Sequence, residues 1–169
     1  MGGEILIKSH LNEGTKITIS LPMDKTNSPL PDQNSNAQDL SKLKGKRVLL
    51  VEDNFMNAEI AKNMLTHYGM LVETAVNGAE AVSAFRVSSL HAYAAILMDI
   101  RMPIMNGFEA AKAIRATARD DAMDVPIIAM TADAYEDDIK RCLDAGMNAH
   151  VSKPIDRASF LAELTCLVH

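Results

Sequence analysis

The chain has 169 residues, of which 48% are hydrophobic, and its formal net charge at pH 7 is -5. Because acidic and basic residues are interspersed, the chain lacks the basic stripe that binds a nucleic-acid backbone, and we expect no nucleic-acid partner. No apolar stretch approaches the roughly 18 residues of a membrane span, and the N-terminus lacks a charged start followed by an apolar signal core. We therefore expect a soluble, cytoplasmic fragment without direct membrane contact.

The first predicted elements are two short strands over residues 4–9 and 15–21, which are rich in β-branched residues and alternate roughly between apolar and polar side chains. The turn residues Asn12-Glu13-Gly14 lie between them, a pattern typical of a β-hairpin. The segment 24–41 has almost no apolar residues, as in a flexible linker. We expect a hairpin, a linker and a main domain over residues 1–23, 24–45 and 46–169, respectively.

After the linker, five short apolar runs alternate with five segments in which apolar residues recur at helical spacing. This alternation indicates an α/β fold: a doubly wound, five-stranded parallel sheet with helices on both faces. The strands are expected over residues 47–51, 71–75, 94–98, 126–130 and 150–152. The helices are expected over residues 58–68, 79–87, 108–117, 135–143 and 157–168.

Polar side chains stand at the ends of four of these strands. Glu52 and Asp53 follow the first, Asp99 the third, Thr131 the fourth and Lys153 the fifth. Ligands of an open parallel sheet bind beyond the carboxyl ends of the strands, at the point where the strand order reverses. We expect these five side chains to converge there.

Three carboxylates in one place repel one another, and a divalent cation compensates their charge. Oxygen ligands with open positions suit Mg²⁺, which keeps several waters. We expect Asp53 and Asp99 to bind Mg²⁺ directly and Glu52 to act through a water. The backbone carbonyl of Arg101 is the expected remaining protein ligand.

Beside a metal ion, Asp99 has the chemistry of a nucleophile toward phosphorus, forming an aspartyl phosphate. The transferring phosphoryl group needs charge neutralisation, for which Lys153 offers an ammonium and Thr131 a hydroxyl donor. A cis peptide bond at Pro154 would aim Lys153 inward.

Each of these residues also has a simpler explanation. An Asp at a strand end is usually a helix cap or a turn former, and Glu52 with Asp53 could mark only the start of a helix. Thr131 could cap the next helix, and Lys153 could be a solvated surface residue. Their joint occurrence around Asp99 favours a shared site.

Residues 46 to 168 resemble a response-regulator receiver domain of two-component signalling. The resemblance rests on an acidic pair, a phosphoacceptor segment, a switch hydroxyl and a lysine: Val51-Glu52-Asp53-Asn54, the segment 98–107, Thr131-Ala132 and Lys153-Pro154. It implies a flavodoxin-like strand order of 2-1-3-4-5. It also implies that Asp99 accepts a phosphoryl group from the phosphohistidine of a histidine kinase and relays it to a histidine phosphotransfer protein.

Five residues that border the pocket are expected to modulate it: Arg101, Ala132, Asp133, His150 and Pro154. Arg101 and Asp133 carry opposite charges that could pair across the entrance and slow hydrolysis of the phosphoryl group. The family often has Tyr or Phe where His150 stands, so the chain departs from the usual aromatic switch at this position. His150 is either modulatory or an ordinary strand residue.

The first 22 residues resemble the last strands of a histidine-kinase ATP-binding domain, through Gly2-Gly3-Glu4-Ile5, the segment 9–15 and Leu21-Pro22. Asn12 replaces the glycine that the family usually has in this turn, and Asn tolerates a left-handed backbone. The resemblance implies a piece of a hybrid histidine kinase, whose membrane attachment is open. Without the rest of the nucleotide site and the phosphorylated histidine helix, the fragment is not expected to bind ATP or act as a kinase.

Two alternatives of other classes stay open. A phosphatase with an aspartyl-phosphate intermediate, of the haloacid-dehalogenase type, places a second acid two residues after the nucleophile, where this chain has Arg101. An interaction domain would keep the fold without being phosphorylated. Mononucleotide binding is disfavoured, since neither a P-loop nor Gly-x-Gly-x-x-Gly follows residues 47–51.

The first predicted helix of the main domain is the expected docking surface for the relay partner. The residues concerned also have the spacing of core residues, which is the commoner explanation for each alone: Ala58, Ile60, Ala61, Met64 and Leu65.

Overall fold

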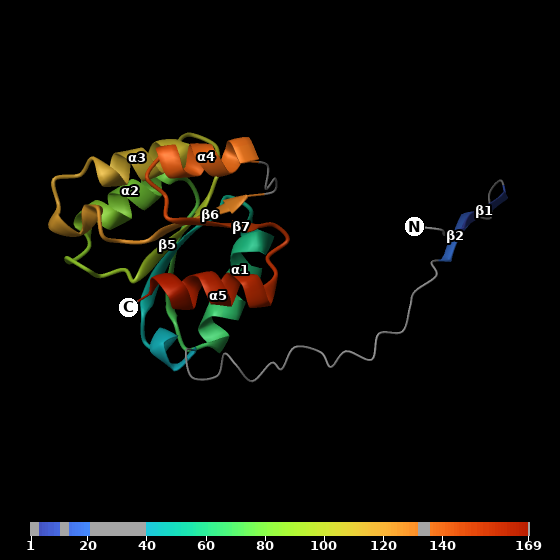
Figure 1. The fold of residues 1–169 in the computed structure, drawn as a ribbon, viewed down its shortest axis with the longest axis horizontal. Helices are drawn as coiled ribbons and strands as arrows, with labels where there is room; N and C mark the ends of the chain where they lie inside the picture. Colours follow the sequence, from blue (N-terminus) through green and yellow to red (C-terminus); the bar gives the residue numbers. More distant parts are fainter. Residues whose placement is uncertain (1–3, 11–13, 21–39, 132–135, 169) are drawn as a thin grey trace. The chain divides into compact units, whose positions relative to one another are not determined.

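The computed structural model describes residues 4–10, 14–20, 40–131 and 136–168 (Figure 1). The chain divides into two compact units, residues 1–34 and 35–169, which are treated separately below. Within the described ranges, no helix has both the length and the apolar character needed to cross a membrane.

The first unit contains the predicted β-hairpin. Strand β1 (Glu4–His10) pairs antiparallel with β2 (Gly14–Ser20), and every residue of both strands is exposed. Ile5 lies opposite Ile19 and Ile7 opposite Ile17, so these four side chains share one face of the ribbon. The hairpin prediction is confirmed.

The second unit is built on a five-stranded parallel sheet with the order β4-β3-β5-β6-β7. Counted within this unit the order is 2-1-3-4-5, which confirms the predicted fold class. The strands are β3 (Arg47–Val51), β4 (Leu71–Ala75), β5 (Ala95–Asp99), β6 (Ile127–Thr131) and β7 (Ala149–Ser152). Strand β3 pairs with both β4 and β5, so the strand order reverses at β3.

Five helices cover the two faces of this sheet (Figure 1). Helices α1 (Phe55–His67) and α5 (Arg157–Leu167) lie on one face. Helices α2 (Gly78–Val87), α3 (Gly107–Arg115) and α4 (Glu136–Asp144) lie on the other. Two short 3₁₀ helices, η2 (Leu40–Leu43) and η3 (Asp120–Ala122), complete the unit as described.

The central strands are buried on both faces, which explains their continuous apolar runs. All residues of β5 and β6 are buried. Along β5, Ile96 and Met98 join the core under α2 and α3, while Leu97 joins the core under α1 and α5. This alternation between the two cores is the period of two expected for a strand.

The main differences from the predicted bounds lie at the starts of α1 and of the folded unit. Helix α1 begins at Phe55, three residues before the predicted start, because the Asn54 side chain accepts hydrogen bonds from the backbone N–H groups of Met56 and Asn57. Leu43 falls within the range predicted as linker, yet it is fully buried in the core under α1 and α5. The folded unit therefore includes η2.

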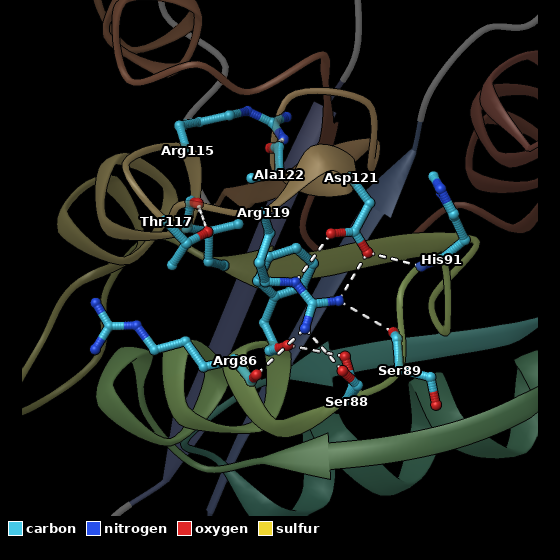
Figure 2. A network of polar contacts seen from close by, with 11 residues as sticks. Arg86, Ser88, Ser89, His91, Arg115, Thr117, Arg119, Asp121 and Ala122 are labelled. Carbon is cyan, nitrogen blue, oxygen red and sulfur yellow. Dashed lines mark hydrogen bonds and ion pairs between the residues drawn. The ribbon is translucent and has the colours of Figure 1, made fainter.

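The loops at the amino ends of the strands are joined by a buried ion pair (Figure 2). Arg119 Nε and Nη2 lie 2.9 Å and 2.8 Å from the two carboxylate oxygens of Asp121. The same guanidinium donates to the backbone carbonyls of Arg86, Ser88 and Ser89. Arg119 thereby ties the end of α2 to η3.

A second arginine, Arg115, anchors the same end of the sheet through neutral acceptors. Its guanidinium donates to the carbonyls of Ala122, Val125 and Gly146 and to Oδ1 of Asn148, at 2.6 to 2.9 Å. Burial lowers the pKa of Arg115 from its usual range.

Candidate functional site

The polar residues predicted to converge do lie at the carboxyl ends of their strands. Asp99 is the last residue of β5 and pairs with Met130, one residue before Thr131 at the end of β6. Carboxylate oxygens of Glu52, Asp53 and Asp99 all lie within 4.8 Å of one another. The parallel register thus gathers these groups from segments far apart in the chain.

Lys153 bridges two of the three carboxylates. Its Nζ lies 2.5 Å from Oε2 of Glu52 and 2.7 Å from Oδ2 of Asp99. Burial alone would lower the pKa of Lys153, but the hydrogen bonds and charges of Asp99 and Glu52 outweigh it and raise the pKa. The side chain is therefore an ammonium at neutral pH.

Glu52 is held on both sides of its carboxylate, and only 4% of the residue is exposed. Oε1 accepts a hydrogen bond from Nδ2 of Asn57 at 3.1 Å and a longer one from the backbone N–H of Asn54 at 3.4 Å, while Oε2 faces Lys153. Protein donors thus surround Glu52. This favours the expected action through a water over direct coordination.

Asp99 is buried, whereas Asp53 is exposed at the mouth of the site. Oδ1 of Asp99 accepts a hydrogen bond from the backbone N–H of Arg101 at 3.2 Å. Of the two residues expected to bind a metal ion directly, one is therefore buried and the other is exposed to solvent. The exposed residue gives an ion access to the site from water.

The loop that follows Asp99 is closed by two close backbone approaches that only glycine permits. A Cβ at Gly107 would lie 2.2 Å from the carbonyl oxygen of Asp99. The backbone N–H of Gly107 donates to the Ile100 carbonyl at 3.0 Å. A Cβ at Gly78 would lie 2.6 Å from the Met105 carbonyl, which accepts the Gly78 N–H at 3.1 Å. These approaches fix the backbone of the loop that follows Asp99.

The remaining predicted residues fall around this centre. Thr131 is buried, and its carbonyl accepts the N–H of Lys153 at 2.6 Å. The peptide bond between Lys153 and Pro154 is cis, as expected. His150 is partly buried in β7 and Arg101 is exposed. Ala132 and Asp133 lie outside the described residues.

A hollow of about 380 Å³ opens beside Thr131 between the loop that follows Asp99, α3 and α4. Its lining combines apolar, polar and charged residues: Ile100, Arg101, Met102, Asn106, Phe108, Thr131, Asp138 and Arg141. The Arg141 guanidinium lies over the Phe108 ring, 4.6 Å from its centroid. Helices α3 and α4 meet at this contact.

The expected docking helix divides between core and surface. Ala61 and Leu65 are buried and belong to the core, whereas Ile60 is 61% exposed. Two exposed neighbours were absent from the prediction: Phe55 at 76% and Met56 at 66%. Both lie before residue 58, where the helix was predicted to start from its apolar spacing, and this explains the omission.

The donor set fits a hard divalent cation. It consists of carboxylate oxygens from Glu52, Asp53 and Asp99, which offer the ligand type that Mg²⁺ prefers. The three carboxylates outnumber the one ammonium, that of Lys153, that bridges two of them. A cation at this place would reduce the remaining repulsion.

The fold and this geometry match a known family. The family model of the response regulator receiver domain matches residues 48–165. The chain therefore belongs to the response regulator receiver domain family.

Its relatives include much longer sensor kinases. It is 43% identical over 122 residues to hybrid signal transduction histidine kinase L of Dictyostelium discoideum, covering 72% of the chain and 7% of that protein. It is 36% identical over 170 residues to the autoinducer 2 sensor kinase/phosphatase LuxQ of Vibrio vulnificus strain YJ016, covering 96% of the chain and 18% of that protein. The chain thus spans only a small part of these relatives.

Two solved structures are informative neighbours. The receiver domain of sensor histidine kinase PA1611 from Pseudomonas aeruginosa PAO1, with magnesium in its active-site cleft, is 39% identical, with a TM-score of 0.65 over 73% of this chain and 97% of that one. The receiver domain of Ssk1 in complex with the phosphotransfer protein Ypd1 of Saccharomyces cerevisiae is 28% identical, with a TM-score of 0.65 over 74% and 90%.

Proposed function

We propose that this receiver domain carries one step of a phosphorelay: Asp99 accepts a phosphoryl group from a phosphohistidine and passes it on or switches the domain. The observation that carries the proposal is the Lys153 ammonium placed 2.7 Å from Asp99 and 2.5 Å from Glu52, with Asp53 in the same cluster. A buried nucleophile beside a cation and further metal-binding oxygens is the arrangement that phosphoryl transfer requires.

In the proposed reaction, a carboxylate oxygen of Asp99 forms a bond to phosphorus while the bond from phosphorus to the donor imidazole nitrogen breaks. The bonding electron pair returns to the imidazole. Lys153 balances negative charge on the phosphoryl oxygens, and the Thr131 hydroxyl donates a hydrogen bond to one of them.

Mg²⁺ would be held by Asp53 and Asp99, by Glu52 through a water and by the backbone carbonyl of Arg101. When bound, the ion neutralises charge on the carboxylates and on the phosphoryl group. The receiver of PA1611, which has magnesium in its active-site cleft, supports the choice of ion.

The proposed partners are the phosphohistidine domain of a kinase and a histidine phosphotransfer protein. Support comes from the Ssk1 receiver, which was solved with such a protein. The first turns of α1 offer an exposed apolar surface next to the acidic residues, formed by Phe55, Met56 and Ile60. Apolar side chains at helical spacing suit a partner helix.

We also propose that residues 1–23 are the end of a kinase ATP-binding domain, joined by the linker 24–45 to the receiver at 46–169 in a cytoplasmic part of a hybrid kinase. The similarity to LuxQ, which covers 96% of the chain, supports this organisation. The residues proposed to tune the lifetime of the phosphoryl group are Arg101, Ala132, Asp133, His150 and Pro154.

Intact-mass measurement after incubation with acetyl phosphate and Mg²⁺ tests the proposal. We expect the wild type to gain one phosphoryl group, and we expect no gain for Asp99→Asn or in the presence of EDTA. A folded wild type that gains nothing would favour the alternative of an interaction domain. Steady turnover of small phosphate esters would favour the phosphatase alternative.

A further inference from the structure

The environment of Glu52 contains a contact that the expected roles do not use. Nδ2 of Asn57, in the first turn of α1, donates to Oε1 of Glu52 at 3.1 Å. The other carboxylate oxygen faces Lys153 at 2.5 Å, and Lys153 also contacts Asp99 at 2.7 Å. Asn57, Glu52, Lys153 and Asp99 thus form one chain of hydrogen bonds from the helix to the nucleophile.

This contact constrains a side chain that has freedom to move. Glu has one more rotatable bond than Asp, so a Glu at this position needs a partner to keep its carboxylate in one orientation. The remaining donor to Oε1, the backbone N–H of Asn54, is more distant at 3.4 Å. The hydrogen bond from the Asn57 side chain is therefore the shorter of the two hydrogen bonds that fix this oxygen.

The Asn57 side chain is separable from the helix cap. The cap uses the backbone N–H of Asn57, which donates to Oδ1 of Asn54 at 3.2 Å, and does not use the Asn57 amide. A substitution that removes the side-chain amide of Asn57 leaves the capping hydrogen bond in place. The side-chain amide of Asn57 binds Glu52, and the start of the helix does not need it.

We propose that Asn57 is a positioning residue for the metal site: its side-chain amide holds the Glu52 carboxylate in the orientation from which Glu52 binds a water ligand of Mg²⁺. The proposal deepens the proposed function and rests on it only for the identity of the ion. Groups that hydrogen-bond to metal-binding side chains commonly change the metal affinity without contacting the metal.

Calorimetric titration of the 169-residue chain with MgCl₂ measures the effect. We expect Asn57→Ala to weaken Mg²⁺ binding by about tenfold, the size of one lost hydrogen bond to a charged group. Asn63→Ala is the matched control, because Asn63 is an exposed residue of the same helix. We expect it to leave the affinity unchanged, and equal affinities for the two variants would overturn the proposal.

A double-mutant cycle separates positioning through Glu52 from any other effect. In a Glu52→Ala background, Asn57→Ala should change the Mg²⁺ affinity by less than about 1.5-fold, because the oriented group is gone. An undiminished loss in that background would contradict the proposal.

Hydrogen exchange of the side-chain amide in the metal-free protein provides a readout independent of any ion. The Asn57 amide protons should exchange more slowly than those of Asn63, and Glu52→Ala should abolish the difference. Equal exchange rates in the wild type would overturn the proposal. Slow exchange in a wild type that never accepts a phosphoryl group would contradict only the proposed function.

Discussion

The two ends of the parallel sheet both bury charge, but they match it differently. At the amino ends of the strands, one guanidinium meets one carboxylate, those of Arg119 and Asp121, and the spare donors of Arg119 reach backbone carbonyls (Figure 2). At the carboxyl ends, three carboxylates gather around one ammonium, that of Lys153.

We interpret this difference as the difference between a structural site and a ligand-binding site. A matched pair with satisfied hydrogen bonds has no remaining need for a ligand, and it holds two loops together. An excess of negative charge raises the free energy of the metal-free site and is relieved when a cation binds. The carboxyl ends of the strands thus hold an excess of negative charge, whereas the Arg119–Asp121 pair at the amino ends is matched.

The largest effect is expected from removing one partner of the Arg119–Asp121 ion pair at the amino ends of the strands. Asp121→Ala leaves the Arg119 guanidinium and the backbone N–H of His91 without their buried carboxylate partner. We expect a loss of about 3 kcal/mol in the free energy of unfolding, measured by urea denaturation. Asp124→Ala, at an exposed position in the same loop, is the control and should change stability by less than about 0.5 kcal/mol. Equal effects of the two variants would refute a structural role for the pair.

The second expected effect concerns the close approach between the backbones of Gly107 and Asp99. Gly107→Ala would place a Cβ 2.2 Å from the Asp99 carbonyl oxygen, so the loop has to shift. We expect a loss of about 2 kcal/mol in unfolding free energy together with slower phosphorylation of Asp99, followed by intact mass. A variant with wild-type stability and rate would show that the loop is not held in place by this contact.

A third test increases the imbalance at the carboxyl ends. Lys153→Ala removes the ammonium that bridges Glu52 and Asp99. Because Mg²⁺ no longer shares the carboxylates with this cation, we expect its affinity to rise by about fivefold, while phosphorylation falls. Calorimetry and intact mass measure the two quantities separately. Weaker Mg²⁺ binding in the variant would mean that Lys153 organises the site more than it competes with the ion.

The smallest effect is a pH dependence of the matched end. Arg119, through its hydrogen bonds, lowers the pKa of Asp121 from 3.8 to about 2. The folded state therefore binds fewer protons than the unfolded state between these values, and the stabilisation is complete above pH 4 and is lost as the pH falls through about 2. Urea denaturation from pH 5 to pH 2 should show a shallower decline for Asp121→Asn than for the wild type. Parallel curves would contradict the shift.

The sequence was a good guide to the site where function depends on residue type at a strand end. The five residues predicted there all lie at this edge of the sheet, because the parallel register gathers strand ends whatever the loops do: Glu52, Asp53, Asp99, Thr131 and Lys153. The strand order and the hairpin were also predicted correctly.

The residues that were missed act through partners that a residue pattern does not encode. Arg115 and Arg119 donate mainly to backbone carbonyls, whose positions depend on the folded loops. Asn57 reaches Glu52 only because the Asn54 cap begins α1 earlier than its apolar spacing indicated. Leu43 was placed in the linker because it stands among polar residues, although it is fully buried.

The most direct test of the account is the position of the phosphoryl group. After reaction with acetyl phosphate and Mg²⁺, borohydride reduction converts an aspartyl phosphate into homoserine, and tandem mass spectrometry locates the modified residue. We expect homoserine at position 99 alone, with none in a sample that contains EDTA. Modification of Asp53 or of an aspartate outside the cluster, or none in a folded wild type, would contradict it.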